Sequence, residues 1–327
     1  MDAQFSAARD GRAQTSYYRH QQRIDPPSTE LYSSLYRYRS YLDQVPLNFL
    51  GRHTLRAPGD ASCMLYFVSL FVGSRGSGKT YSAVKLLKAY ELAGIADADS
   101  PHTKVGQRVV LFSPTHDANP VFTSLAHLDE SDIITEYTDA KLLEVVEDVK
   151  REREATAEYR RLMRLYRKFL RCKSIDELES DELFELERMD FNPPQEPRYP
   201  NGCVTFFVLD DLIGSSAFKS TGKSALTNLV LKNRHLGINI LCMTQNLRAI
   251  PKSIRTNTSL FVVFRYASKR IITEDLYEEV SNILTLDRFE EVYEYATGGD
   301  HSALVLDFTG PKESRIRRNF DTILHVE

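Results

Sequence analysis

The chain has 327 residues, of which 42% are hydrophobic, which is enough for one large core with appendages. Its 42 basic and 45 acidic residues leave a net charge of -3, so the overall field neither requires nor excludes nucleic acid, and any DNA contact must come from a local patch. No apolar run approaches the roughly 20 residues of a membrane span, no signal-peptide core is visible, and the four cysteines lack disulfide or metal spacing, which together predict a soluble intracellular protein.

The N-terminal part, residues 1–60, is polar, rich in Tyr and Arg and free of lysine. Arg interleaved with Tyr can stack on bases or pair with phosphates, but tyrosines packed on a neighbouring subunit would give the same composition. We predict an arm or small cap over residues 1–60 and a main domain over residues 61–327.

From residue 65 onward, short β-branched or aromatic runs alternate with helical patterns. Such alternation predicts an α/β fold with a mostly parallel sheet flanked by helices. Each run is nearly continuous, as in strands covered on both faces. The predicted strands are Leu65–Val72, Arg108–Ser113, Cys203–Asp210, Ile238–Thr244, Thr258–Tyr266 and Ser302–Phe308.

A charged helical insertion interrupts this alternation at about residues 139–192. Residues 150–173 hold ten basic and three acidic residues, whereas residues 176–190 hold eight acidic residues and one basic residue. We favour a helical hairpin whose two arms attract each other, and a free basic helix that faces DNA is the alternative.

A phosphate-binding loop follows the first predicted strand. Gly73-Ser-Arg-Gly-Ser-Gly-Lys-Thr80 matches the pattern G-x-x-x-x-G-K-[ST] and opens a predicted helix from Tyr81 to Ala93. The backbone from Gly73 through Ser74, Gly76 and Gly78 is expected to wrap the phosphates, with Arg75 and Ser77 as fillers of the loop. Lys79 should reach the β and γ phosphates of ATP, and Thr80 should bind Mg²⁺.

Two aspartates end the third predicted strand. Because the carboxyl ends of parallel strands meet at one edge of the sheet, Asp210 and Asp211 should lie beside the phosphate-binding loop. We expect Asp210 to hold Mg²⁺ through its water shell and Asp211 to polarise the attacking water. A turn or a helix N-cap would also place paired acids there.

The next strand ends in Thr244 and Gln245. We expect Gln245 to sense the γ phosphate or to orient water, and a plain strand cap is the alternative. An acid-bearing strand followed by one inserted strand is typical of the additional-strand, RecA-like P-loop NTPases. It favours a recombination or translocation motor over a nucleoside kinase.

These parts together resemble the FtsK and HerA-like superfamily of P-loop ATPases, and within it the DNA-packaging ATPases of large DNA viruses and virophages. Besides the loop and the acid pair, the resemblance is carried by the following stretches: Leu111-Phe-Ser-Pro-Thr115, Asn119-Pro120, Asn233-Arg-His-Leu-Gly-Ile-Asn239, Thr244-Gln245 and Ile250-Pro-Lys-Ser-Ile-Arg-Thr-Asn257. It covers residues 65–308 and leaves out the N-terminal arm and the charged insertion.

The resemblance implies a motor that hydrolyses ATP to pull double-stranded DNA into a preformed capsid. It also implies a homo-oligomeric ring, a pentamer or hexamer, that works with capsid portal or vertex proteins in the host cytoplasm or a virus factory. A ring with ATP between neighbours needs an arginine in trans, and Arg234 is the first candidate and Arg255 the second. The alternative for each of them is an arginine that lies on the surface or contacts DNA and has no role in catalysis.

Two further basic stretches are candidate DNA contacts. The loop after the acid pair carries Lys219 and Lys223, which could grip phosphates without reading bases, although a plain flexible loop fits equally well. The stretch from Lys312 to Arg318 is a second candidate, and a solvated tail is its alternative.

Three functions remain open from the sequence. They are a DNA-packaging translocase, a helicase or recombination motor with the same core, and a P-loop switch that controls assembly and turns over poorly. DNA stimulation of hydrolysis separates the motors from the switch, and strand separation identifies a helicase.

Overall fold

The structure is a computed structural model that describes residues 55–56, 65–97, 104–116, 120–218, 224–266, 272–281 and 283–326. Nearly all of the predicted N-terminal arm, residues 1–60, therefore lies outside the described residues. None of the described helices is both long and apolar enough to cross a membrane.

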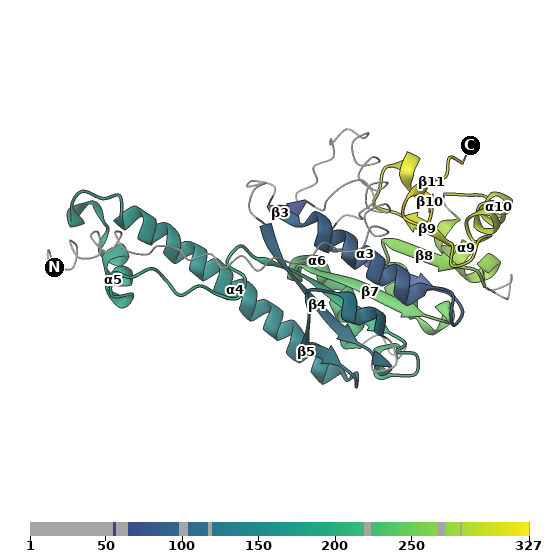
Figure 1. Ribbon diagram of the computed structural model, residues 1–327, viewed down its shortest axis with the longest axis horizontal. Helices are drawn as coiled ribbons and strands as arrows, with labels where there is room; N and C mark the ends of the chain where they lie inside the picture. The colour runs from purple at the N-terminus through teal and green to yellow at the C-terminus, as the bar shows by residue number, and fades with distance from the viewer. Residues whose placement is uncertain are drawn as a thin grey trace, which may run out of the picture. The chain divides into compact units, whose positions relative to one another are not determined.

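A mixed, mostly parallel β-sheet forms the centre of the fold (Figure 1). Within the described chain its strand order is β1-β3-β4-β6-β7-β2-β8-β9-β10-β11, and β5 pairs with β4. The neighbours β5, β4, β6, β7, β2 and β8 run parallel, whereas β9, β10, β11, β3 and β1 are joined by antiparallel pairing. The strands are β1 Leu55–Arg56, β2 Val68–Val72, β3 Ile95–Asp97, β4 Lys104–Phe112, β5 Leu128–Ile134, β6 Cys203–Asp210, β7 Ile238–Thr244, β8 Leu260–Phe264, β9 Ala303–Asp307, β10 Ile316–Arg318 and β11 Thr322–Ile323.

The predicted α/β class is confirmed, and each of the six predicted strands is present. Strands β6 and β7 have the predicted bounds, and one or both ends of each of the other four are moved by one to four residues. The prediction missed β5, whose sequence includes Asp129, Glu130 and Asp132 and shows no apolar alternation. It also missed β1, β3, β10 and β11, which have two or three residues each and are too short to give a pattern.

Helices cover both faces of the sheet, and the strands are buried on both sides. Helix α3 (Lys79–Ala93) packs on one face, where Phe67 and Phe71 meet its buried residues. Helices α6 (Ala225–Leu236) and α10 (Leu286–Ala296) pack on the other face, together with the start of α4. The intervening residues of β2, such as Leu70, point to this second face, as the period of two requires.

The remaining helical segments are short. Helix α7 (Lys252–Arg255) follows β7, and a π-helical turn (Ile272–Leu276) leads into α9 (Tyr277–Val280). Single 3-10 turns are formed by Pro120–Ser124, Ile175–Glu177, Ser216–Phe218, Leu247–Ala249 and Lys312–Ser314.

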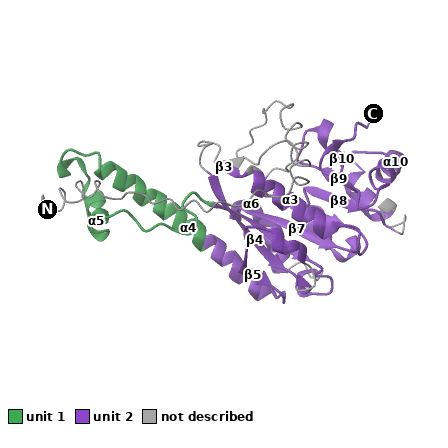
Figure 2. Ribbon diagram, viewed as in Figure 1, with its two compact units in different colours: residues 1–48, 151–202 green, residues 49–150, 203–327 purple. Residues whose placement is uncertain are grey.

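The chain divides into two compact units (Figure 2). The described part of unit 1 is residues 151–202, and unit 2 comprises the described residues within 49–150 and 203–327. Unit 2 contains the sheet. Unit 1 contains most of the charged insertion, although α4 (Asp139–Phe169) begins in unit 2.

Within unit 1, the last part of α4 and helix α5 (Ser180–Arg188) pack against each other. Phe169, Leu186 and Phe191 form a small buried cluster. Arg161 contacts Glu185 at 3.2 Å, and Lys168 contacts Glu182 at 2.5 Å. The insertion is therefore the helical hairpin with attracting arms that the charge pattern favoured.

Candidate functional site

The glycine-rich loop lies between β2 and α3, as predicted. Two carbonyl oxygens of the loop point toward Lys79, the first residue of α3. Lys79 Nζ donates to Gly73 O at 2.9 Å and to Ser74 O at 2.8 Å. Helix α3 begins at Lys79, so the amide groups of its first turn point into the loop, where an anion is favoured.

Two glycines are required by the shape of the loop. A Cβ at Gly73 would lie 2.6 Å from Ser77 Oγ and 2.7 Å from Phe264 Cβ, so no side chain fits there without movement. Gly78 has a φ of 103°, a left-handed conformation that non-glycine residues rarely adopt. A Cβ at Gly78 would lie 3.3 Å from His301 Cβ.

The strand order brings the acid pair to the same edge as the loop. Strand β7 lies between β2 and β6, so the acid-bearing strand is separated from the loop strand by one inserted strand. Met243 of β7 pairs with Asp210 of β6 on one side and with Phe71 of β2 on the other. Phe71 comes two residues before Gly73, so the acid pair and the loop start at the same level of the sheet. This is the arrangement that the order of motifs predicted for an additional-strand P-loop NTPase.

The Asp210 carboxyl is buried, and Ser113 at the end of β4 donates a hydrogen bond to its Oδ2 at 3.3 Å. Burial and the neighbouring Asp211 raise the pKa of Asp210 to about 6, although the Ser113 hydrogen bond and the Lys79 charge oppose that shift. A cation placed beside this carboxyl would favour its ionised form and so oppose the shift.

Lys79 is electrostatically coupled to the acid pair. Burial lowers the pKa of Lys79, and the charges of Asp210 and Asp211 act in the opposite direction. The ammonium group thus lies within the field of both carboxylates. Nearby, Ser77 Oγ is buried and has no hydrogen-bond partner among the described residues, which leaves a polar atom unsatisfied at the cradle.

Asp211 and Gln245 meet at the strand ends. Gln245 Nε2 donates to Asp211 Oδ1 at 3.4 Å. Asp211 has a φ of 51°, which turns the chain sharply after β6. The Tyr266 hydroxyl donates to the Gln245 carbonyl oxygen, and this contact fixes the backbone that carries the amide.

The two candidate trans arginines do not lie at the phosphate-binding loop of their own chain. Arg234 is near the end of α6, immediately before β7, and is therefore at the amino end of the parallel strands. The seven residues of β7 separate that edge from the loop edge by roughly 20 Å. Arg234 is exposed and lines a hollow of about 260 Å³ with Asn257 and Ser259.

Arg255 lies shortly before β8, near the same edge, and forms an ion pair with Glu279 of α9 at 3.7 Å. Both side chains are nearly buried, at 13% and 10% exposure. The side chains of the two candidate arginines therefore differ in their availability to a neighbouring subunit. The Arg234 side chain makes no hydrogen bond or ion pair within the part of the chain that is described, whereas the Arg255 side chain is paired with Glu279.

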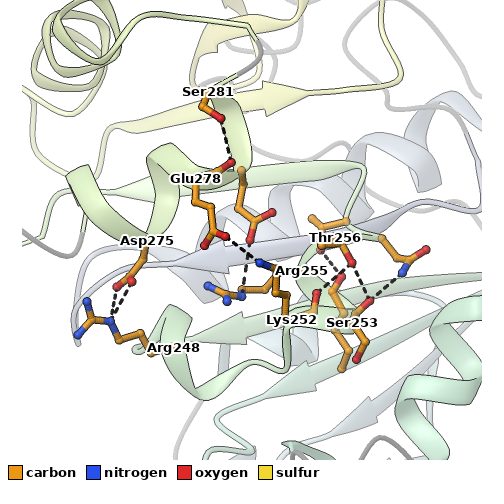
Figure 3. A network of polar contacts seen from close by, with 12 residues as sticks. Arg248, Lys252, Ser253, Arg255, Thr256, Asp275, Glu278 and Ser281 are labelled. Carbon is orange, nitrogen blue, oxygen red and sulfur yellow. Dashed lines mark hydrogen bonds and ion pairs between the residues drawn. The ribbon is translucent and has the colours of Figure 1, made fainter.

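The Arg255 contact belongs to a larger polar network that ties the segment after Gln245 to the α9 region (Figure 3). Arg248 contacts Asp275 at 2.7 Å, and Lys252 contacts Glu278 at 2.8 Å. All three basic residues lie between β7 and β8: Arg248 in the 3-10 turn after β7, and Lys252 and Arg255 in α7. The acidic residues come from the π-helical turn and α9.

Of the two predicted DNA-contacting stretches, the structure describes the one near the C-terminus but not the two lysines of the loop after the acid pair. Lys219 and Lys223 lie outside the described residues, as does Asn119 of the motif Asn119-Pro120 that carried part of the resemblance. The basic stretch near the C-terminus is folded into the sheet, because β10 pairs with β9 and Arg317 is 9% exposed. Its interpretation as a solvated tail is wrong. Arg318 lies over the Tyr295 ring, with 5.6 Å between its Cζ and the ring centroid.

Several residues around the site were not predicted to contribute to it. Ser113, Phe264 and Tyr266 were predicted only as parts of strands, Ser113 also as part of a family motif, and His301 gave no signal in the sequence. Phe264 and His301 reach the loop because β8 and β9 are antiparallel, which places the start of β9 beside the end of β8.

Comparison with solved structures finds similar folds in a viral packaging enzyme and in secretion ATPases. The genome packaging NTPase B204 of Sulfolobus turreted icosahedral virus 2 is 12% identical, covers 82% of this chain and 97% of its own, and has a TM-score of 0.41. The type VII secretion ATPase EccC of Thermomonospora curvata is 20% identical, covers 79% of this chain and 25% of its own, with a TM-score of 0.35. EssC of Geobacillus thermodenitrificans is 14% identical, covers 79% of this chain and 38% of its own, with a TM-score of 0.39.

No protein-family model and no curated protein matches the sequence. By their names, these structural neighbours are nucleotide-hydrolysing enzymes. Since their TM-scores are below 0.5, the assignment of the site rests on its own geometry: the loop, the intervening strand and the acid pair at one edge.

Proposed function

We propose that the protein is an ATP-driven motor that translocates double-stranded DNA and packages a viral genome into a preformed capsid. The observation that carries the proposal is that Lys79 of the glycine-rich loop lies in the field of Asp210 and Asp211, with one strand inserted between their strands. This is the constellation that P-loop ATPases need to bind and cleave a triphosphate.

The residues present fit a bound Mg·ATP complex. The first amides of α3 and the Ser77 hydroxyl, which has no hydrogen-bond partner among the described residues, would donate hydrogen bonds to phosphate oxygens. Lys79 would give up its hydrogen bonds to the carbonyl oxygens of Gly73 and Ser74 and bind phosphate instead. Thr80 and Asp210 would hold Mg²⁺, because hydroxyl and carboxylate oxygens suit this hard cation. The described residues contain no group of three His, Cys, Asp or Glu side chains suited to a metal, so the nucleotide and water would supply the other ligands.

Mg²⁺, when bound, neutralises charge on the transferring phosphoryl group. In our proposal, Asp211 polarises the attacking water, since it lies next to the metal-binding aspartate and is exposed. Gln245 orients that water or senses the γ phosphate, because its amide contacts Asp211. An arginine from a neighbouring subunit would stabilise the transition state, and Arg234 is favoured because Arg255 is occupied by Glu279.

DNA is proposed as the substrate because of the family resemblance and because a genome packaging NTPase is among the structural neighbours. A ring of identical subunits and capsid portal proteins as partners belong to the same proposal. Secretion ATPases are also among the neighbours, so a motor that moves another polymer is the alternative that the experiment must separate.

The deciding experiment measures ATP hydrolysis with and without long duplex DNA, alongside the mass of the assembly in the presence of ATP. The proposal predicts that duplex DNA stimulates hydrolysis and that Lys79→Ala abolishes it. Stimulation that is accompanied by strand separation would identify a helicase instead. Nucleotide-driven assembly without stimulation by DNA would refute the DNA motor and leave a switch or a motor that moves another polymer.

A further inference from the structure

Unit 1 carries a row of arginines that the hairpin does not use. From Arg160 to Lys173 the sequence contains seven basic residues and no acidic one. The hairpin contacts account for three of them: Arg161 pairs with Glu158 and Glu185, Lys168 pairs with Glu182, and Arg160 Nε donates to the Pro200 carbonyl oxygen.

Three of the remaining residues form one face. Arg164, Arg167 and Arg171 are exposed, and their side chains make no hydrogen bond or ion pair with any residue in the described part of the chain. At spacings of three and four residues they share one side of α4 and of the turn that continues it, over roughly 10 Å of helix axis. Together with Lys168 they line a hollow of about 520 Å³.

We infer that this arginine face, Arg164, Arg167 and Arg171, is a binding site for the phosphate backbone of duplex DNA, separate from the ATPase site. The inference deepens the proposed motor function and rests on it. Three guanidinium groups on one side of a straight helix meet successive phosphates of a backbone without reading bases, as a translocase requires.

The chemistry of the face favours a polyanion over a protein partner. Protein interfaces bury an apolar centre, but the one large apolar side chain exposed in residues 151–202 is Phe184, which belongs to α5 and does not line the hollow. One acidic residue, Glu177, also lines the hollow, where its carboxylate accepts a hydrogen bond from the Lys173 amide. The three arginines and Lys168 outnumber it, so the lining keeps a net positive charge. Glu182 and Glu185 of the acidic arm are engaged by Lys168 and Arg161.

The test measures binding of a fluorescent duplex of mixed sequence to the full chain across a series of salt concentrations. Three phosphate contacts should make the slope of log K against log salt steeper by about 2 to 3. The triple variant Arg164→Ala, Arg167→Ala, Arg171→Ala should lose this part of the slope and at least about tenfold in affinity at low salt. A triple replacement of the same arginines by Lys should keep most of the affinity, because the charge remains.

A charge-matched control replaces exposed basic residues of unit 2: Lys141→Ala, Lys232→Ala, Arg288→Ala. The inference predicts near-normal binding for this control and normal DNA-independent ATPase activity for the arginine triple variant. Equal losses in both variants, or a normal slope in the arginine variant, would overturn it. A variant that lost affinity for polyglutamate but kept affinity for DNA would show a protein-binding face instead.

Failure of the inference is distinguishable from failure of the motor proposal. If the unmodified chain binds duplex and hydrolyses ATP in response to it, while the arginine triple variant behaves identically, only the arginine face is refuted. If the unmodified chain neither binds duplex nor responds to it, the motor proposal fails, and the arginine face fails with it.

Discussion

Among single residues, the Asp210 carboxyl has the protonation that its surroundings alter most clearly in the candidate site. Its pKa in the folded protein is about 6, above the ordinary value of 3.8, because the carboxyl is buried beside Asp211. The folded state therefore binds this proton more tightly than the unfolded state does. The stabilisation due to the proton is fully present below pH 4 and is lost as the pH rises through 6.

Asp210→Asn should consequently raise the free energy of unfolding of the nucleotide-free protein by about 1 to 3 kcal/mol at pH 7.5 while abolishing ATP hydrolysis. The gain should shrink as the pH falls below 6. Denaturant unfolding at several pH values measures it, with the exposed Asp321→Asn as control. A variant that is less stable than the parent at pH 7.5 would contradict the electrostatic reasoning.

The glycines of the loop give a second prediction at this scale. In Gly73→Ala the new Cβ would collide with Ser77 and Phe264, whereas in Gly76→Ala the Cβ meets open space and only the positive φ of 76° is strained. We expect Gly73→Ala to cost about 1 to 3 kcal/mol of stability and Gly76→Ala about 1 kcal/mol. Nucleotide affinity, measured with a non-hydrolysable ATP analogue, should fall more in Gly73→Ala. The reverse order would argue against the packing of the loop against β8.

At the scale of elements, the network between α7 and α9 contains pairs of very different burial. Arg255 and Glu279 are nearly buried, and burial raises the pKa of Glu279 despite the nearby Arg255 charge. Glu279→Ala should lower the free energy of unfolding by on the order of 2 kcal/mol, because it leaves a guanidinium group buried and unpaired.

The neighbouring pair supplies a matched control for that prediction. Glu278 contacts Lys252, and both side chains are more than half exposed, so Glu278→Ala should change stability little. Chemical denaturation of the two variants compares them directly. Equal losses in both would mean that the burial of the Arg255 pair has no energetic consequence.

The elements also show what a sequence can reveal of such a fold. Strands β2, β6 and β7 were predictable because both of their faces are covered, which leaves continuous apolar runs. Strand β5 was missed because its acidic residues resemble a loop, yet Asp132 is buried in a salt bridge with Arg108 of β4. Such long-range pairing leaves no local pattern.

The same distinction holds for the candidate site. The phosphate-binding loop and the acid pair follow local patterns, and the strand order that joins them was predictable from the order of the motifs. The Tyr266 contact to the Gln245 backbone and the packing of His301 beside Gly78 come from segments far apart in the chain. Only the folded arrangement brings these residues to the site.

At the scale of the whole molecule, the position of Arg234 has a consequence for assembly. Because Arg234 lies at the edge opposite its own phosphate-binding loop, it can serve catalysis only in a neighbouring subunit. Arg234→Ala and Lys79→Ala should each be inactive alone, and a one-to-one mixture should regain part of the hydrolysis, because mixed interfaces combine an intact loop with an intact arginine. Lys232→Ala, on the same helix, is the control and should be active alone. No recovery in the mixture would exclude Arg234 as the residue supplied in trans.

We propose that Lys79, Asp210 and Asp211 form one nucleotide site, and measurements of ATP binding and single-turnover hydrolysis with Mg²⁺ in single variants of these residues test it. Lys79→Ala should lose binding, and Asp210→Asn should lose the Mg²⁺ dependence of binding. Asp211→Asn should bind ATP normally but cleave it at least about a hundredfold more slowly. Normal cleavage by both aspartate variants would contradict the claim.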